Sequence, residues 1–160
     1  MDVAVEALDA KVSTFMDWCR SRGLETDAAI ALAVGRKRDV TIRNWRESGD
    51  VPGWLPYACF GYGLLQEQQM QRYPKIPDWS VALLTEWRHR MGLGSDKQFG
   101  DAIGLSKQAV FKWYAYSSVP QYVSRVCLGY QWLVETHGAG SDPWKCLADE
   151  AAKPSKIGDR

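Results

Sequence analysis

The sequence predicts an all-α protein that contains two tandem copies of one small helical bundle. The prediction depends on three observations. The chain repeats itself at a nearly constant spacing, its apolar residues recur every three or four positions, and alternation at every second position is weak throughout. A chain of 160 residues has room for two small domains, each with a modest core.

The repeat has a spacing of 69 residues in the first part of each copy and of 68 in the second part. Seven identical residues align between Val12 and Gly35 at the first spacing, and eight align between Trp45 and Glu67 at the second. Several of these pairs are Trp, Cys, Gly or Pro, which seldom coincide by composition alone. The sequence therefore indicates a duplication, with one residue fewer after the equivalent of Gly35 in the second copy.

The first helix of each copy is predicted at residues 6–22 and 79–91. Apolar residues recur there at the spacing of an amphipathic helix. Gly23 and Gly92 follow these segments, and glycine is the residue that most often ends a helix.

The second helix of each copy is predicted to begin after an N-cap. Thr26 and Ser95 have the side chains that cap a helix start, and each is followed by an Asp, which favours the positive end of the helix dipole. These helices are expected to end near Gly35 and Gly104.

The third helix of each copy is expected to run to about Ser48 and Tyr116. Pro52 and Pro120 then interrupt the helical pattern. The fourth helices are expected in the segments "WLPYACFGYGLLQEQ" and "YVSRVCLGYQWLVET".

The predicted division of the chain follows from this repeat. The first domain spans residues 1–70, and a linker at 71–78, "QRYPKIPD", contains two prolines. The second domain spans 79–137, and residues 138–160 form a partly ordered tail with a short helix around 145–152. Because the linker is short, we do not expect the two copies to be fully independent. Repeated Trp residues are expected in the core, and the others could lie between copies or chains.

Composition limits the classes of function. The net charge is +1, so a nucleic-acid surface would have to be local. Apolar runs are shorter than the roughly 20 residues that cross a bilayer, and the start of the chain does not resemble a secretory signal, so we expect a cytoplasmic protein without membrane contact. The scattered cysteines predict buried thiols and no zinc site; they are Cys19, Cys59, Cys127 and Cys146.

The segment from Lys97 to Trp113 has the spacing of a helix-turn-helix. Gly104 permits a sharp turn, Ser106 caps the next helix, and Val110 and Trp113 anchor that helix to the core. The residues expected on its outer face are Lys107, Gln108, Phe111 and Lys112.

The outward residues have side chains suited to reading a major groove. Lys can donate to guanine O6 and N7, and Gln can pair with adenine N6 and N7. An exposed Phe can contact a thymine methyl group. The competing interpretation is a solvated helix face with no ligand.

The second copy resembles a known family. The stretch "FGDAIGLSKQAVFKWYAYSSVP" is similar to the lambda-repressor/Cro-like helix-turn-helix proteins. The resemblance covers about 22 residues well and the whole copy more loosely. It implies that Lys107, Gln108 and Lys112 read bases, that Ser106 lies near the phosphates, and that the chain is a bacterial or phage transcription regulator.

The first copy departs from this pattern. In "ALAVGRKRDVTIRNWRESGDVP", one more residue separates Gly35 from Trp45 than separates the equivalent pair, so the turn or the helix start must differ. Counting back from Trp45 gives the residues equivalent to Lys107, Gln108 and Lys112 of the second copy. They are Asp39, Val40 and Asn44, with Arg43 beside them. Asp39, Arg43 and Asn44 are the candidate base-reading residues of this copy. Asp39 and Val40 are poor partners for a phosphate, although an Asp can accept a hydrogen bond from cytosine N4.

A local positive cluster surrounds that helix start. It suits contact with DNA phosphates, which would supply affinity without sequence information. Its candidate phosphate-binding residues are Arg36, Lys37, Arg38 and Arg46.

These observations predict a sequence-specific double-stranded DNA-binding regulator of bacterial or mobile-element genes, located at the nucleoid. The residues do not suggest catalysis, a metal or a cofactor. One chain could bind two half-sites by itself, or two chains could associate as a homodimer. Two other functions remain open: a protein-binding antiactivator or adaptor with a degenerate helix-turn-helix, and a phage DNA-packaging or recombination accessory factor.

Overall fold

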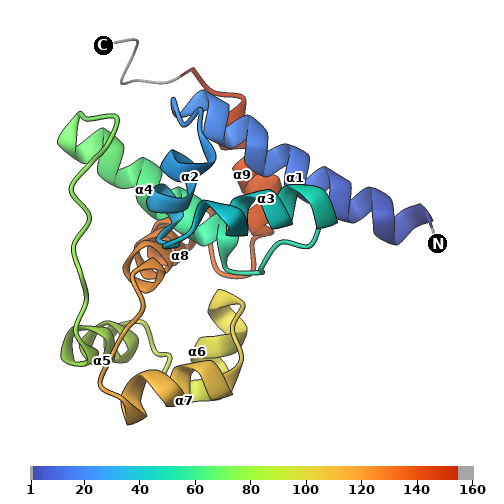
Figure 1. Ribbon diagram of the computed structural model, residues 1–160. Helices are drawn as coiled ribbons and strands as arrows, with labels where there is room; N and C mark the ends of the chain where they lie inside the picture. The colour runs from blue at the N-terminus through green and yellow to red at the C-terminus, as the bar shows by residue number, and fades with distance from the viewer. Residues whose placement is uncertain (1, 155–160) are drawn as a thin grey trace.

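The computed structural model describes residues 2–154, with side chains described from residue 10 onward, and this part of the chain folds as nine α-helices without a strand (Figure 1). The all-α prediction is confirmed. The last residues of the predicted tail, 155–160, lie outside the described part. The helices are α1 (Asp2–Ser21), α2 (Asp27–Val34), α3 (Asp39–Ser48), α4 (Leu55–Gln69), α5 (Val81–Arg90), α6 (Asp96–Ile103), α7 (Lys107–Ala115), α8 (Tyr122–His137) and α9 (Pro143–Ala151).

The helices α1 to α4 recur in the same order as α5 to α8. The predicted caps of the second helices are present in both halves. The hydroxyl of Thr26 accepts a hydrogen bond from the backbone N–H of Ala29, and the hydroxyl of Ser95 accepts one from Gln98. The first helices differ in length: α1 has 20 residues and begins earlier than predicted, whereas α5 has 10 and begins after Ser80, whose side chain caps it.

Each half contains the same aromatic pair in its core. Trp18 of α1 meets Tyr62 of α4 with ring centroids 6.3 Å apart and an interplanar angle of 74°. Trp87 of α5 meets Tyr130 of α8 at 6.1 Å and the same angle. Both tryptophans are 1% exposed, as expected for repeated core residues.

The two halves join where α4 crosses α8, and glycines make the crossing close. A Cβ atom added at Gly61 would lie 2.0 Å from the carbonyl oxygen of Arg125. A Cβ atom added at Gly129 would lie 1.7 Å from the carbonyl oxygen of Tyr57. Gly61 and Gly129 are 68 residues apart, as are Tyr57 and Arg125, so the two contacts are equivalent. The first half contacts the second in the same way as the second contacts the first. The halves are therefore related by an approximate two-fold axis.

An aromatic stack lies on this axis. Trp54 and Tyr122 occupy equivalent positions in the repeat, and their rings stack with centroids 4.4 Å apart and an interplanar angle of 17°. Trp45 contacts the outer side of Trp54 edge-on, at 6.0 Å, and Trp113 contacts Tyr122 in the same way, at 6.4 Å. Trp54 thus belongs to the contact between copies, which is one of the two roles expected for the less constrained tryptophans.

The segment after α8 breaks the two-fold relation. Helix α9 packs against α1 and α4, close to the position expected for a short helix, and it buries Cys146 and Leu147. Residues 143–151 therefore pack with the helices of the first half rather than standing apart from both domains.

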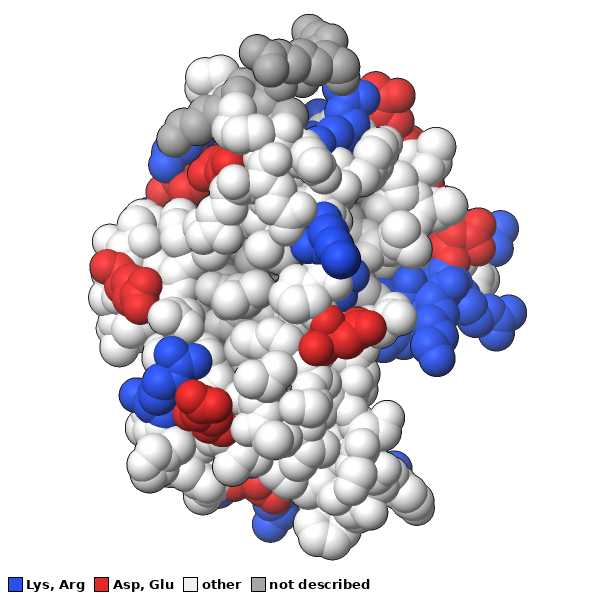
Figure 2. All heavy atoms as spheres, turned by 90° about the vertical axis from the view of Figure 1, so that its left-hand side faces the viewer, with Lys and Arg blue, Asp and Glu red and all other residues white. Residues whose placement is uncertain are grey.

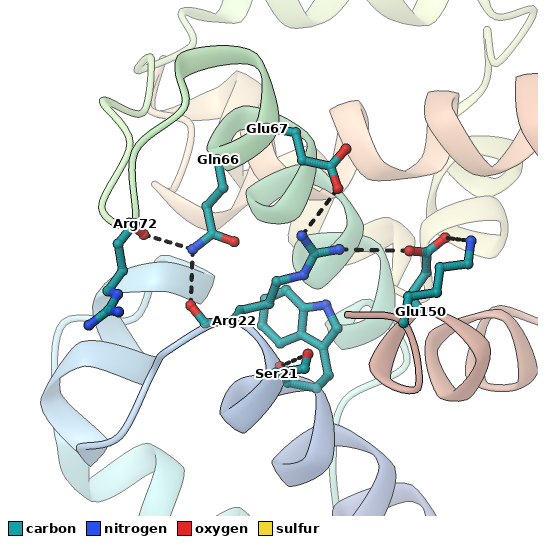
Figure 3. Close-up of polar contacts among 8 residues, drawn as sticks. Ser21, Arg22, Gln66, Glu67, Arg72 and Glu150 are labelled. Carbon is teal, nitrogen blue, oxygen red and sulfur yellow. Dashed lines mark hydrogen bonds and ion pairs between the residues drawn. The ribbon is translucent and has the colours of Figure 1, made fainter. Parts of the chain in front are cut away.

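Figure 3 shows the polar contacts that hold α9 there. Arg22, at the end of α1, contacts Glu67 of α4 at 3.3 Å and Glu150 of α9 at 3.7 Å. Lys153 also contacts Glu150, at 3.0 Å. The side-chain amide of the buried Gln66 donates to the backbone oxygen atoms of Arg22 and Arg72, so the same cluster holds the start of the linker.

The four cysteines are buried and form no disulfide, as the sequence predicts. Burial raises the pKa of the Cys59 and Cys127 thiols well above the ordinary value, because the charged thiolate would lose its hydration. None of the described helices has both the length and the apolar composition that a membrane span requires.

The glycine contact predicts a sharp difference between two neighbouring substitutions in α4. Gly61→Ala places a methyl group against the backbone of α8, so the free energy of unfolding is expected to fall by about 3 kcal/mol. Gly63→Ala meets only the flexible Arg22 side chain, 3.3 Å away, and is expected to stay within about 1 kcal/mol of the original protein. Urea unfolding followed by circular dichroism measures both, and equal losses would contradict the close crossing.

Candidate nucleic-acid interface

Helix α7 presents the outer face that the sequence predicts. Val110 is fully buried and Trp113 is 6% exposed, so these residues anchor the helix. The predicted outward residues Lys107, Gln108, Phe111 and Lys112 are all exposed. They form two parallel ridges along the helix, and Tyr116, beyond the end of α7, extends the ridge that contains Gln108 and Lys112.

The turn before α7 is set by local chemistry and by the other half of the chain. Ser106 accepts a hydrogen bond from the backbone N–H of Ala109, at 3.2 Å, as an N-cap. Gly104 ends α6 with a φ of 78°, in the left-handed region. A Cβ atom at Gly104 would lie 2.6 Å from the backbone of Gly53, so this turn also abuts the loop between α3 and α4.

The extra residue of the first copy lies in the turn, not in the helix. Helix α6 is separated from α7 by residues 104–106, whereas α2 is separated from α3 by residues 35–38. The start of α3 lies six residues before Trp45, as the start of α7 lies six residues before Trp113. The helix registers therefore correspond as the alignment predicts.

Helix α3 offers a different chemistry on the same scaffold. Asp39, Arg43 and Asn44 are exposed, and Val40 is half-buried. Arg38 stands in the N-cap position without a capping side-chain hydrogen bond. The start of α3 therefore lacks the cap that Ser106 gives to α7, and its first residue is acidic rather than basic.

The predicted phosphate-binding residues of the first copy do not form one group. Arg46 donates a hydrogen bond to Asp27 at the start of α2, so its charge is partly neutralised within the protein. Lys37 and Arg38 are exposed, and the guanidinium of Arg36 lies 5.7 Å from the centre of the Tyr122 ring. Among the described residues, no ion pair involves these last three cations.

One face of the protein carries a local group of basic side chains. The face shown in Figure 2 has its largest group of Lys and Arg side chains at the right-hand edge, at the height of the start of α3 in Figure 1. Elsewhere on this face, acidic and basic side chains are scattered and mixed. This face therefore has a local excess of basic side chains that the net charge of +1 conceals.

A buried arginine that sequence reasoning missed holds the first turn in place. Arg125 of α8 is 6% exposed and donates hydrogen bonds to the backbone oxygen atoms of Ala33, at 2.7 Å, and Leu32, at 3.2 Å. Both oxygens belong to the last turn of α2, where the helix dipole favours a cation. A third bond, 2.5 Å long, joins Arg125 to the backbone oxygen of Gln121.

Burial lowers the pKa of Arg125 to about 10, which still leaves the guanidinium charged at neutral pH. The available signal in the sequence was a single cation within an otherwise apolar stretch of the fourth helix. Such a residue needs buried acceptors, but the sequence does not tell which backbone supplies them.

None of the known protein families, curated proteins or solved structures with which the chain was compared matches it. In residues 10–154, no three or more His, Cys, Asp or Glu side chains are grouped to hold a metal ion.

The cap of α7 predicts a measurable loss when it is removed. Ser106→Ala leaves the N–H of Ala109 without its acceptor and is expected to lower the free energy of unfolding by about 1 kcal/mol. Ser118→Ala, in the exposed loop before α8, is the matched control and should be close to neutral. Thermal unfolding of the two variants gives the comparison, and similar stability in both would argue against the cap.

Replacing Arg125 should loosen the turn of the other half. Arg125→Met removes the side-chain donor of the Ala33 carbonyl and leaves the Leu32 carbonyl with only the backbone N–H of Gly35. The free energy of unfolding is therefore expected to fall by about 3 kcal/mol. Hydrogen exchange should accelerate most at the amides of Gly35 and Arg36. Arg90→Met, at an exposed position, is the control. Loosening spread evenly over the chain would contradict a specific role.

Proposed function

We propose that the chain is a sequence-specific double-stranded DNA-binding regulator of bacterial or mobile-element transcription. It acts by binding, without catalysis. The observation that carries the proposal is the exposed start of α7, where Lys107, Gln108 and Lys112 project from a helix that Ser106 caps and Trp113 anchors. Such a helix, reached through a glycine turn, has the form of a recognition helix.

The approximate two-fold axis supports binding to two half-sites by one chain. Proteins of this type commonly read two half-sites as symmetric dimers. Here α3 and α7 are equivalent elements of a single body, one above and one below α8 in Figure 1. Because Asp39 stands where Lys107 stands in the other half, the two half-sites would differ in sequence.

A protein-binding adaptor is the second candidate. Phe111 is 65% exposed and Tyr116 is 78% exposed, and large exposed aromatic side chains are typical anchors of protein interfaces. The acid at the start of α3 also weakens its fit to a phosphate backbone. This alternative predicts retention of a protein partner in salt concentrations that release DNA.

Substitution of the proposed base-reading residues tests the DNA function. Gln108→Ala and Lys112→Ala should each relax the preference at particular base pairs by about 1–3 kcal/mol, because each loses its contact with a base edge. The preferred sites are first selected from a random duplex library, and affinities are then measured by fluorescence anisotropy.

Lys75→Ala, an exposed change in the linker, provides the control and should leave the selected site unchanged. If the original protein enriches no site, or if all three variants select the same site, the proposed recognition by α7 is wrong.

A further inference from the structure

A cavity lies between the two halves, beside the first turn. Its volume is about 440 Å³, and it opens to solvent between the turn that joins α2 to α3 and the loop that joins α7 to α8. The first wall contains Arg36, Lys37, Arg38 and Thr41, and the second contains Ser118 and Gln121.

The cations of the first wall lack acidic partners in the described part of the chain, although Arg36 lies over the Tyr122 ring. No ion pair among the described residues involves these three cations. The Nε atom of Arg36 is buried and has no hydrogen-bond partner in the described part of the chain. A buried donor without an acceptor is costly, and the side chain that carries this donor lines the cavity.

The helix that begins at this wall also has donors that lack a side-chain acceptor. Arg38 gives α3 no side-chain cap, so the first N–H groups of α3 lack a side-chain acceptor. A helix start with free N–H groups attracts anions, and phosphate groups above all. Asp39 lies at the same helix start, but it is exposed and does not line the cavity.

The equivalent place in the other half does not have this chemistry. The turn between α6 and α7, residues 104–106, contains no cation, and Ser106 caps its helix. The concentration of charge is therefore a property of one side of an otherwise two-fold arrangement. A structural need of the fold would be expected on both sides.

We propose that this cavity holds one phosphate group of the DNA backbone, contacted by both halves of the chain at once. The guanidinium groups of Arg36 and Arg38 suit the oxygen atoms of a phosphate, and Ser118 and Gln121 add donors from the opposite wall. Tyr122, which stacks on the two-fold axis, also lines the cavity. The phosphate would therefore belong to the DNA between the two half-sites. The inference rests on the proposed DNA-binding function.

The sharpest test places a negative charge on the wall opposite the cations. Gln121→Glu is nearly isosteric, and it sets a carboxylate beside the proposed phosphate from a loop outside both helix-turn-helix segments. Gln68→Glu, an exposed change near the end of α4, is the matched control, because it alters the net charge by the same amount.

Fluorescence anisotropy with a selected duplex, titrated with salt, measures the effect. Gln121→Glu is expected to weaken binding about tenfold or more, since like charges would meet at close range. The slope of log affinity against log salt should fall by about one for the lost phosphate contact. Gln68→Glu should change affinity by less than about twofold, because screening weakens distant charges. Equal effects of the two variants on a duplex that still binds would overturn the proposal.

A titration with inorganic phosphate separates this inference from the proposed function. If the original protein binds no duplex, the proposed DNA function is wrong. Changes in the amide chemical shifts of residues 36–41, measured by nuclear magnetic resonance during the titration, then show whether the cavity binds phosphate. Saturable shifts that disappear in Gln121→Glu would support a site for a free phosphate group. Absence of such shifts would overturn the cavity as an anion site of any kind.

Discussion

The close contact between the backbones of α4 and α8 is the constraint on which the rest of the structure depends. Two helices approach this closely only where neither has a side chain at the crossing, and Gly61 and Gly129 meet that requirement on both sides. A methyl group at either position would collide with a carbonyl oxygen of the other helix. The crossing therefore fixes how far apart the two halves are and how they are rotated.

The crossing also decides what surrounds each turn. With α4 and α8 in contact, Gly35 lies against the backbone of Tyr122 at the start of α8, and Gly104 lies against Gly53. Each turn is thus supported by the half to which it does not belong. Arg125 strengthens this arrangement on one side only, by donating to the end of α2. The two outward helices α3 and α7 are consequently parts of one body, whose relative placement is built into the core.

Symmetry in the core coexists with asymmetry at the surface. The aromatic pairs and the glycine crossing occur twice, at the repeat spacing, because packing depends on shape and both halves must fill the same volume. The exposed residues of α3 and α7 share almost nothing, since packing does not constrain them. The turn before α3 is longer, more basic and uncapped, and it borders a cavity. The two outer helices therefore share one scaffold but differ in their exposed chemistry.

The sequence by itself determined the helical class, the repeat, the order of the helices and the caps at Thr26, Ser95 and Ser106. These features depend on short-range chemistry: Thr26, Ser95 and Ser106 bind backbone groups three residues away, and Gly104 adopts the left-handed conformation that glycine allows without steric cost. The exposed face of α7 was predictable for the same reason, because helical spacing alone separates Val110 from Lys107.

Only the tertiary structure decided which distant groups meet. It placed α9 on the first half, paired Arg46 with Asp27, buried Arg125 against the end of α2 and opened a cavity between the two halves. Each of these contacts joins segments that no local pattern links. The Arg125 contacts and the cavity depend on how α4 crosses α8, whereas α9 and the Arg46–Asp27 pair depend on packing against the first half. A sequence read one helix at a time contains neither arrangement.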